Sequence, residues 1–197
     1  MKRILLAATI LTSGLLFTQC VKKGRTVTRV DPTTQTDLSG RWNDTDSRLV
    51  AEEMTKDCIN RTWRSDFMAK HGRKPVVIVG IITNKSHEHI EAETFIKDME
   101  REFINTATVR VVQNSEFREK MRVEREDQQT YASPETQKKW GKELGADFMV
   151  FGTMNSFVDA YNKTKAVTYQ INLELADMET NEIVWIGDKK IKKVIQD

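Results

Sequence analysis

The chain has 197 residues, of which 30% are charged and 39% are hydrophobic, so it can form one folded domain but not two large ones. It carries 31 lysines and arginines against 29 aspartates and glutamates, a net charge of +2. This near balance argues against a basic surface that binds nucleic-acid phosphates, and no nucleic-acid partner is expected.

The first residues have the layout of a secretory signal peptide. Lys2 and Arg3 form a short positive segment, and an uncharged, mainly apolar stretch follows over residues 4–17. A helix of that length is too short to cross a hydrocarbon core of about 30 Å. The sequence therefore predicts a cleaved signal, not a permanent membrane span.

Cys20 stands directly after this stretch, where a bacterial lipobox places the cysteine that receives a diacylglycerol group. We therefore expect a signal peptide over residues 1–19 and a lipid anchor on Cys20. Phe17 and Gln19 differ from the aliphatic and small residues usual in that motif, and the alternative is a secreted protein cleaved elsewhere. With Cys20 lipidated, Cys58 is the remaining thiol, so no internal disulfide is expected.

A flexible tether is expected over residues 20–38, beginning at the lipidated cysteine. This segment is rich in threonine and charge and has no apolar periodicity. The folded domain is expected over residues 39–197, and we find no internal repeat or second domain in it.

A long amphipathic helix is predicted at the start of the domain. Asp44, Thr45 or Asp46 can accept the free backbone N–H groups of its first turn, and Gly72 and Pro75 end it. Its apolar residues recur at helical spacing, at Val50, Met54, Cys58, Ile59, Trp63 and Phe67. A cysteine on such a stripe is expected to be a buried structural thiol, not a nucleophile.

A strand buried on both faces is predicted next, because residues 75–83 form a continuous apolar run. A helix over residues 89–106 and a short strand over residues 109–112 follow. The helix places three apolar side chains on one face, Phe95, Met99 and Phe103. Strand, helix and strand in this order predict a parallel crossover.

The charged segment 115–132 predicts a surface helix with a thin apolar stripe. Ser133 and Pro134 are a cap and a first residue for another helix, in which Trp140 and Leu144 face inward.

Three strands with short connections are predicted in the last part of the chain, over residues 146–158, 166–178 and 182–194. The middle strand alternates apolar side chains on one face, at Val167, Tyr169, Ile171, Leu173 and Leu175. The predicted fold class is therefore mixed α/β: about five strands in one mixed sheet flanked by helices, with a βαβ unit followed by an antiparallel meander.

Polar residues gather after the buried strand, where α/β proteins often place ligand sites. Asn84, His87, Glu88, His89 and Glu91 stand within eight positions. Two histidines separated by one residue can both bind a metal on an extended segment. No third ligand is evident, so we favour a polar loop whose side chains cap the following helix.

Catalytic and cofactor motifs are lacking in the sequence. It contains no Gly-x-Ser-x-Gly elbow and no glycine-rich dinucleotide loop between a strand and a helix. We therefore expect no enzymatic activity, no metal, no cofactor and no small-molecule substrate.

Lysines alternate around Ile191 near the end of the last predicted strand. Lysines on an edge strand commonly prevent edge-to-edge aggregation, and this is the favoured interpretation. The alternative is a recognition site for an acidic partner, which would bind by adding a strand to the edge.

Several stretches between about Leu38 and Lys193 together resemble the LpoB-type activators of penicillin-binding proteins. These stretches are LSGRWNDTDSRLVAEEM, PVVIVGIITNKSHEHI, DMEREFINTATVRVV, KELGADFMVFGTMNS and YQINLELADMETNEIVWIGDKKIKK. The resemblance implies a domain similar to the N-terminal domain of TolB, in a lipoprotein that is anchored in the outer membrane and faces the periplasm.

The resemblance also implies a bifunctional penicillin-binding protein as the partner, whose peptidoglycan synthesis the lipoprotein stimulates. Candidate contact residues are Asn84, His87 and His89 in the loop, with Tyr131 and Phe151 as aromatic anchors. The tether is short compared with the long ones of this family. The alternative function is a CsgG-like or TolB-like component of an envelope secretion or transport assembly.

Overall fold

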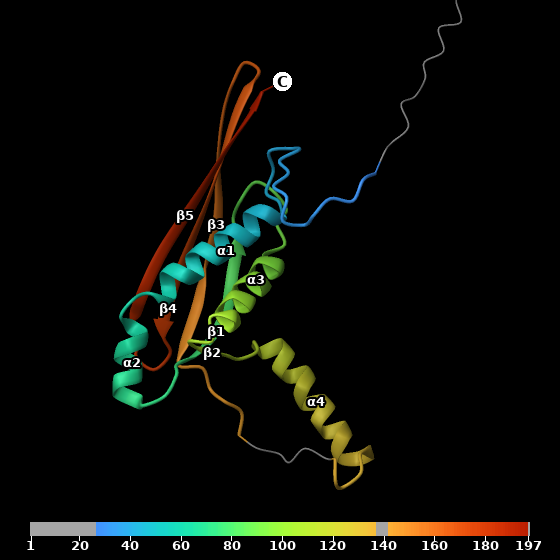
Figure 1. Cartoon of the computed structure of the whole chain (residues 1–197), viewed down its shortest axis with the longest axis vertical. Helices are drawn as coiled ribbons and strands as arrows, with labels where there is room; N and C mark the ends of the chain where they lie inside the picture. Colours follow the sequence, from blue (N-terminus) through green and yellow to red (C-terminus); the bar gives the residue numbers. More distant parts are fainter. Residues whose placement is uncertain (1–26, 137–141, 197) are drawn as a thin grey trace, which may run out of the picture. The chain divides into compact units, whose positions relative to one another are not determined.

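The computed structural model describes residues 27–136 and 142–196 (Figure 1). Residues from Thr33 onward belong to one unit, and residues 27–32 before it are exposed. The helices are α1 (Asp44–Ile59), α2 (Trp63–His71), α3 (Ala92–Asn105) and α4 (Ser115–Tyr131). The strands are β1 (Val76–Asn84), β2 (Arg110–Val111), β3 (Phe148–Tyr161), β4 (Thr164–Asp177) and β5 (Ile183–Gln196).

The five strands form one mixed sheet in the order β2-β1-β3-β4-β5. β1 is parallel to both β2 and β3, whereas β3, β4 and β5 pair antiparallel. The predicted mixed α/β class, the parallel unit through α3 and the antiparallel meander are therefore confirmed. β2 has only two residues, fewer than the predicted strand over residues 109–112.

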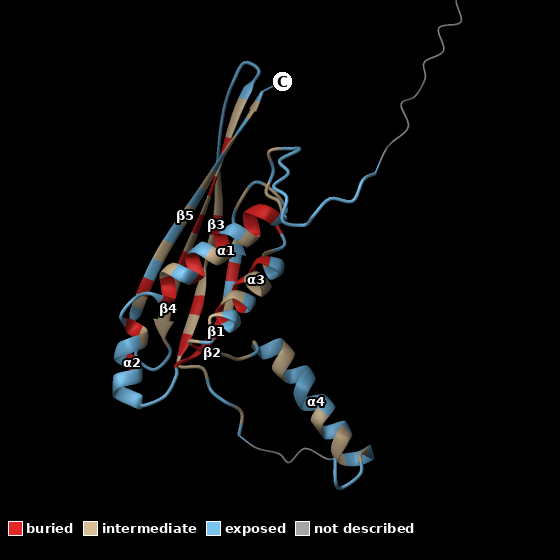
Figure 2. Cartoon of the chain, in the orientation of Figure 1, coloured by how far each residue is buried: buried red, intermediate tan, exposed pale blue. Residues whose placement is uncertain are grey.

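The core lies between the sheet and the pair α1 and α3. These helices contact each other, α1 also contacts β5 and α3 also contacts β1. Figure 2 shows the buried residues on the sides of the helices and strands that meet. All five predicted inward residues of β4 are buried, as are the three predicted on α3. We call the side of β3, β4 and β5 that points away from α1 and α3 the outer face.

The predicted single helix at the start of the domain is wrong, because the chain forms two helices with a break over residues 60–62. The backbone N–H of Arg61 bonds to the Cys58 carbonyl, which tightens the end of α1. The indole N–H of Trp63 also donates to that carbonyl, at 2.7 Å. Gly72 ends α2 with a left-handed backbone (φ 65°), as the sequence predicts.

The cap of α1 is Asn43, one residue before the three that the sequence indicates. The Asn43 side chain accepts a hydrogen bond from the backbone N–H of Asp46 at 3.1 Å. The Asp46 carboxylate in turn accepts from the backbone N–H of Asn43 at 3.0 Å. This reciprocal arrangement is a capping box, so Asp46 contributes at the third helical position and not as the cap itself.

The helix predicted after Ser133 is also wrong in the described residues. Ser133 opens only a turn, closed by a bond from the Thr136 N–H to its carbonyl, and residues 142–147 are not helical. Leu144 is 39% exposed and does not face the core, while Trp140 lies outside the described residues. The backbone N–H of Asp147 already donates to the Val76 carbonyl, so the chain must be extended there to enter the sheet.

Candidate partner-binding site

The loop that follows β1 is closed by its own hydrogen bonds. The Asn84 amide donates to the Glu88 carbonyl at 2.8 Å, and its oxygen accepts from the Ser86 backbone N–H at 2.9 Å. The Ser86 hydroxyl also donates to the Glu88 carbonyl, at 3.1 Å. Asn84 therefore fixes the shape of this loop.

The two loop histidines have separate partners. The backbone N–H of His87 donates to the Ser156 hydroxyl at 3.0 Å, and its Nδ1 lies 2.6 Å from the same oxygen. His89 is 89% exposed, with Nε2 2.6 Å from the Glu91 carboxylate. Within the described residues, no group of three or more His, Cys, Asp or Glu side chains could hold a metal ion.

The prediction that the loop caps the next helix is wrong. Glu91 occupies the cap position of α3, and its side chain makes no capping hydrogen bond. The polar side chains instead bond within the loop and to the strands beneath it, because Ser156 on β3 and Tyr169 on β4 offer hydroxyl groups there.

Glu88 connects the loop to the core, a role that the sequence analysis did not assign to it. Its Oε1 accepts from the Tyr169 hydroxyl at 2.8 Å, and its Oε2 accepts from the Trp42 backbone N–H at 3.2 Å. The rings of Trp42 and Tyr169 meet edge to face, 5.6 Å apart. Burial, and then the bond to Glu88, raises the pKa of Tyr169.

One signal for this contact was present in the sequence. Tyr169 is the one polar member of the inward row on β4, and a buried tyrosine hydroxyl usually has a hydrogen-bond partner. The identity of that partner was not readable, because Glu88 stands 81 positions away.

Lys193 on β5 holds the segment before α1. Its ammonium donates to the carboxylates of Asp37 and Asp46, each at 2.6 Å, and to the Arg41 carbonyl at 2.9 Å. The bond from Lys193 lowers the pKa of Asp37 to about 2. Burial opposes the charge on Lys193, but the bonds to the two carboxylates outweigh it, so its pKa is raised. The last residues of the expected tether are thus bonded to the sheet.

The other candidate residues do not join the loop. Phe151 is half-buried on the outer face of β3, opposite Glu174 of β4. Tyr131 is the last residue of α4 and is 81% exposed. Cys20 and the signal segment lie outside the described residues. The structure therefore brings together Asn84, His87 and Glu88, the last of which the sequence placed in the loop but not among the candidate contact residues.

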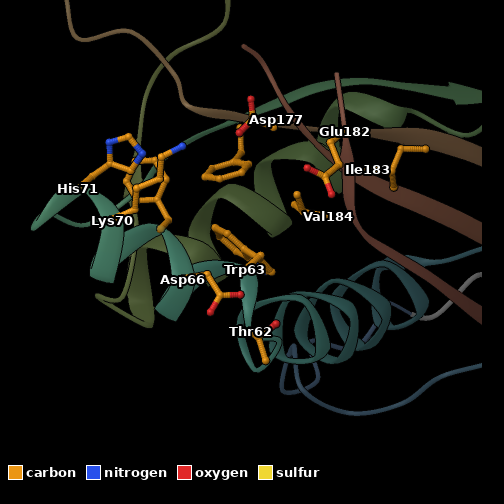
Figure 3. Close-up of a pocket in the computed structure, with 11 residues that line it drawn as sticks. Thr62, Trp63, Asp66, Lys70, His71, Asp177, Glu182, Ile183 and Val184 are labelled. Carbon is orange, nitrogen blue, oxygen red and sulfur yellow. The ribbon is translucent and has the colours of Figure 1, made fainter. Parts of the chain in front are cut away.

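A separate pocket of about 380 Å³ lies at the opposite end of the sheet (Figure 3). Three aromatic rings line it and meet edge to face: Trp63, Phe67 and Phe148. Polar side chains come from α2 and from the β4–β5 connection: Asp66, Lys70, His71, Asp177 and Glu182. This mixed lining suits a polar side chain or another small polar group.

The Asp177 carboxylate of that pocket is already used by the turn. It accepts from the backbone N–H groups of Glu179 and Thr180, at 2.8 and 2.9 Å. Burial opposes its ionisation, yet these bonds outweigh burial and lower the pKa of Asp177. Its first role is therefore to shape the turn.

Cys58 is fully buried in α1, as predicted from its place on the apolar stripe. Burial raises the pKa of its thiol, which keeps it protonated at neutral pH. No helix among the described residues combines the length and the apolar composition that a membrane crossing needs.

The fold is a small α/β domain. The polar side chains of the loop after β1 form hydrogen bonds within the loop and to Ser156 on β3 and Tyr169 on β4. The sequence profile of the family described as peptidoglycan-synthase activator LpoB matches residues 46–191. The chain belongs to this family. No curated protein matches the chain significantly.

Solved structures with similarity to the chain include two LpoB C-terminal domains. The one from Escherichia coli is 16% identical, with a TM-score of 0.39, over 75% of this chain and 99% of that domain. The one from Salmonella enterica is 16% identical, with a TM-score of 0.34, over 66% and 92%. Lipoprotein GNA1162 from Neisseria meningitidis is 12% identical, with a TM-score of 0.40, over 61% and 83%.

Proposed function

We propose that this protein activates a peptidoglycan synthase by binding it, that the synthase is a bifunctional class A penicillin-binding protein, and that the chain itself performs no bond chemistry. The observation that carries the proposal is the match to the LpoB family over residues 46–191, which spans more than half of the chain. Activation by binding needs only a higher affinity for the active state of the synthase. A coupling of about 1 to 3 kcal/mol would change the equilibrium between the inactive and active states of the synthase several-fold to about a hundredfold.

The polar loop supports a binding role for that end of the domain. Asn84 and Glu88 hold the loop in one shape, so little conformational entropy is lost when a partner binds it. His89 is 89% exposed in the loop, so a partner surface can reach it. The side chains most suited to chemistry, His87 and Glu88, already bond to Ser156 and Tyr169.

We further propose that the protein is an outer-membrane lipoprotein that faces the periplasm and is anchored through Cys20. This part rests on the sequence, in which Cys20 directly follows a signal-like segment. Intact mass analysis of the mature protein tests it. A chain that begins at Cys20 and carries acyl groups is expected, and a chain that begins elsewhere or lacks them contradicts the anchor.

Activation is tested by adding the purified protein to a class A penicillin-binding protein from the same organism and following lipid II polymerisation. We expect a faster rate and co-purification of the two proteins. A double variant in the loop, Asn84→Ala with His89→Ala, should reduce the stimulation if this loop contacts the partner. An unchanged rate with the unaltered protein, together with no co-purification, would reject the activator assignment for that pair.

A further inference from the structure

β5 forms one edge of the sheet and has β4 as its neighbour on one side only. It runs for 14 residues, contains no proline, and pairs with β4 without a shift from Trp185 to Gln196. Among the described residues, no backbone group bonds to its other side. A long, regular row of backbone donors and acceptors is therefore unpaired on this side, with residues 37–40 lying beside its Lys192–Ile195 part, and another strand can pair with it.

The lysines of β5 fall into two groups with different surroundings. Lys189 and Lys193 point toward α1, where Glu53, Asp37 and Asp46 neutralise them. Lys190 and Lys192 point to the outer face, where their neighbours on β4 are the uncharged Gln170 and Thr168. Both are exposed, and neither has an ion pair among the described residues.

The outer face of β5 therefore presents a fixed order of side chains to an added strand. Apolar Ile186 and Val194 stand at the two ends, 66% and 59% exposed. Asp188, Lys190 and Lys192 lie between them at alternate positions. Side chains directly opposite each other on neighbouring strands stabilise the pair when they are both apolar or oppositely charged.

Neither a second copy of β5 nor the basic segment before the domain fits this edge. An antiparallel second β5 with its apolar ends matched would pair Asp188 with Lys192, but it would place Lys190 beside Lys190, and like charges on paired strands repel. Residues 21–30 carry four lysines and arginines and no acidic residue, so they are repelled as well. The charges select a strand that carries carboxylates.

We propose that the free edge of β5 binds an extended acidic segment of a protein partner as a sixth strand of the sheet. Two carboxylates of that segment lie beside Lys190 and Lys192, and apolar side chains lie beside Ile186 and Val194. The proposal deepens the proposed function and rests on it only for the identity of the partner, the synthase.

A peptide experiment tests the edge without any synthase. One synthetic peptide alternates threonine with valine, glutamate, glutamate, serine and valine, so that its five outward side chains match the five of β5, and a matched peptide has lysines in place of the glutamates. We expect the acidic peptide to bind roughly tenfold more tightly and to slow amide exchange along β5. The double variant Lys190→Glu with Lys192→Glu should reverse the preference. Equal binding of both peptides, or no protection of β5 by either, overturns the proposal.

A synthase experiment then identifies the partner. The double variant Lys190→Glu with Lys192→Glu should lose most of the stimulation, whereas Lys120→Glu with Lys142→Glu, which changes the net charge equally at residues outside β4 and β5, should keep it. Full stimulation by the β5 variant overturns the edge as the synthase contact. If the unaltered protein gives no stimulation, the proposed function fails, and the peptide experiment still decides whether the edge binds acidic strands.

Discussion

The ammonium of Lys193 lies 2.6 Å from the carboxylate of Asp46, although the two residues stand 147 positions apart. Their side chains are only 9% and 8% exposed, so the pair is almost completely withdrawn from water. The contact joins the first turn of α1 to the edge strand β5. It therefore links the start of the domain to its last strand.

Replacing Lys193 by methionine should leave the buried Asp46 carboxylate without its cation. Loss of one partner of a buried pair is costly, and we expect the free energy of unfolding to fall by about 3 kcal/mol in urea denaturation. Lys192→Met, one position along on the outer face, should change it by less than about 0.5 kcal/mol. Equal effects of the two substitutions would contradict the assigned role of the Lys193 contacts.

Stability should depend on pH through Asp37, whose pKa is lowered from 3.8 to about 2 by the bond from Lys193. A carboxyl with a lowered pKa stabilises the fold above its ordinary pKa, and this contribution is lost as the pH falls through the lowered value. The difference in stability between the unaltered protein and Asp37→Asn should therefore shrink as the pH falls from about 4 to about 2. Denaturation across that range measures it, and a constant difference would speak against this assignment.

Removal of the Tyr169 hydroxyl should loosen the loop after β1. Tyr169→Phe leaves one oxygen of Glu88 without its donor, at an expected cost of about 1 to 2 kcal/mol. Amide exchange over residues 85–91 should become faster, as measured by NMR. Tyr161→Phe is the matched control, because that ring is 80% exposed. Unchanged exchange in Tyr169→Phe would mean that Glu88 does not hold the loop.

A methyl group at Gly152 should destabilise the sheet. A Cβ there would overlap the backbone carbonyl oxygen of Asn172 on β4, which cannot move without disturbing the ladder. We expect Gly152→Ala to lower the free energy of unfolding by about 1 to 3 kcal/mol. Gly145→Ala has no atom within 4 Å of the added carbon, so it should be tolerated and serves as the control.

Cys58 should resist thiol reagents in the folded protein, because burial both shields the sulfur and raises its pKa. In a Cys20→Ser chain it is the only thiol, and alkylation should then proceed no faster than unfolding. Rapid alkylation under native conditions would show that α1 opens more readily than its packing indicates.

Much of the architecture was predictable because it depends on local patterns. The apolar run of β1, the alternation along β4 and the apolar face of α3 each follow from which side of an element is buried. The break between α1 and α2 was not predictable by this means, because Ile59, Trp63 and Phe67 keep helical spacing across it. The indole bond from Trp63 to the Cys58 carbonyl is a contact that periodicity does not encode.

The candidate site was predictable only in its location. The polar residues after β1 indicated the loop, but the partners that hold it, Ser156 and Tyr169, come from β3 and β4. Such contacts depend on how distant strands are aligned. The aromatic pocket was not predictable for the same reason, because its walls come from three distant parts of the chain: α2, the start of β3 and the β4–β5 turn.

The bonds of Lys193 have a mechanical consequence. A pull on the chain ahead of Asp37 is resisted first by ionic contacts to β5, before any turn of α1 can unwind. The load passes from Lys193 to β5, which pairs with β4 from Thr164 to Ala176. The ionic contacts of Lys193 therefore connect the N-terminal end of the domain directly to this long strand pair, and not only to α1.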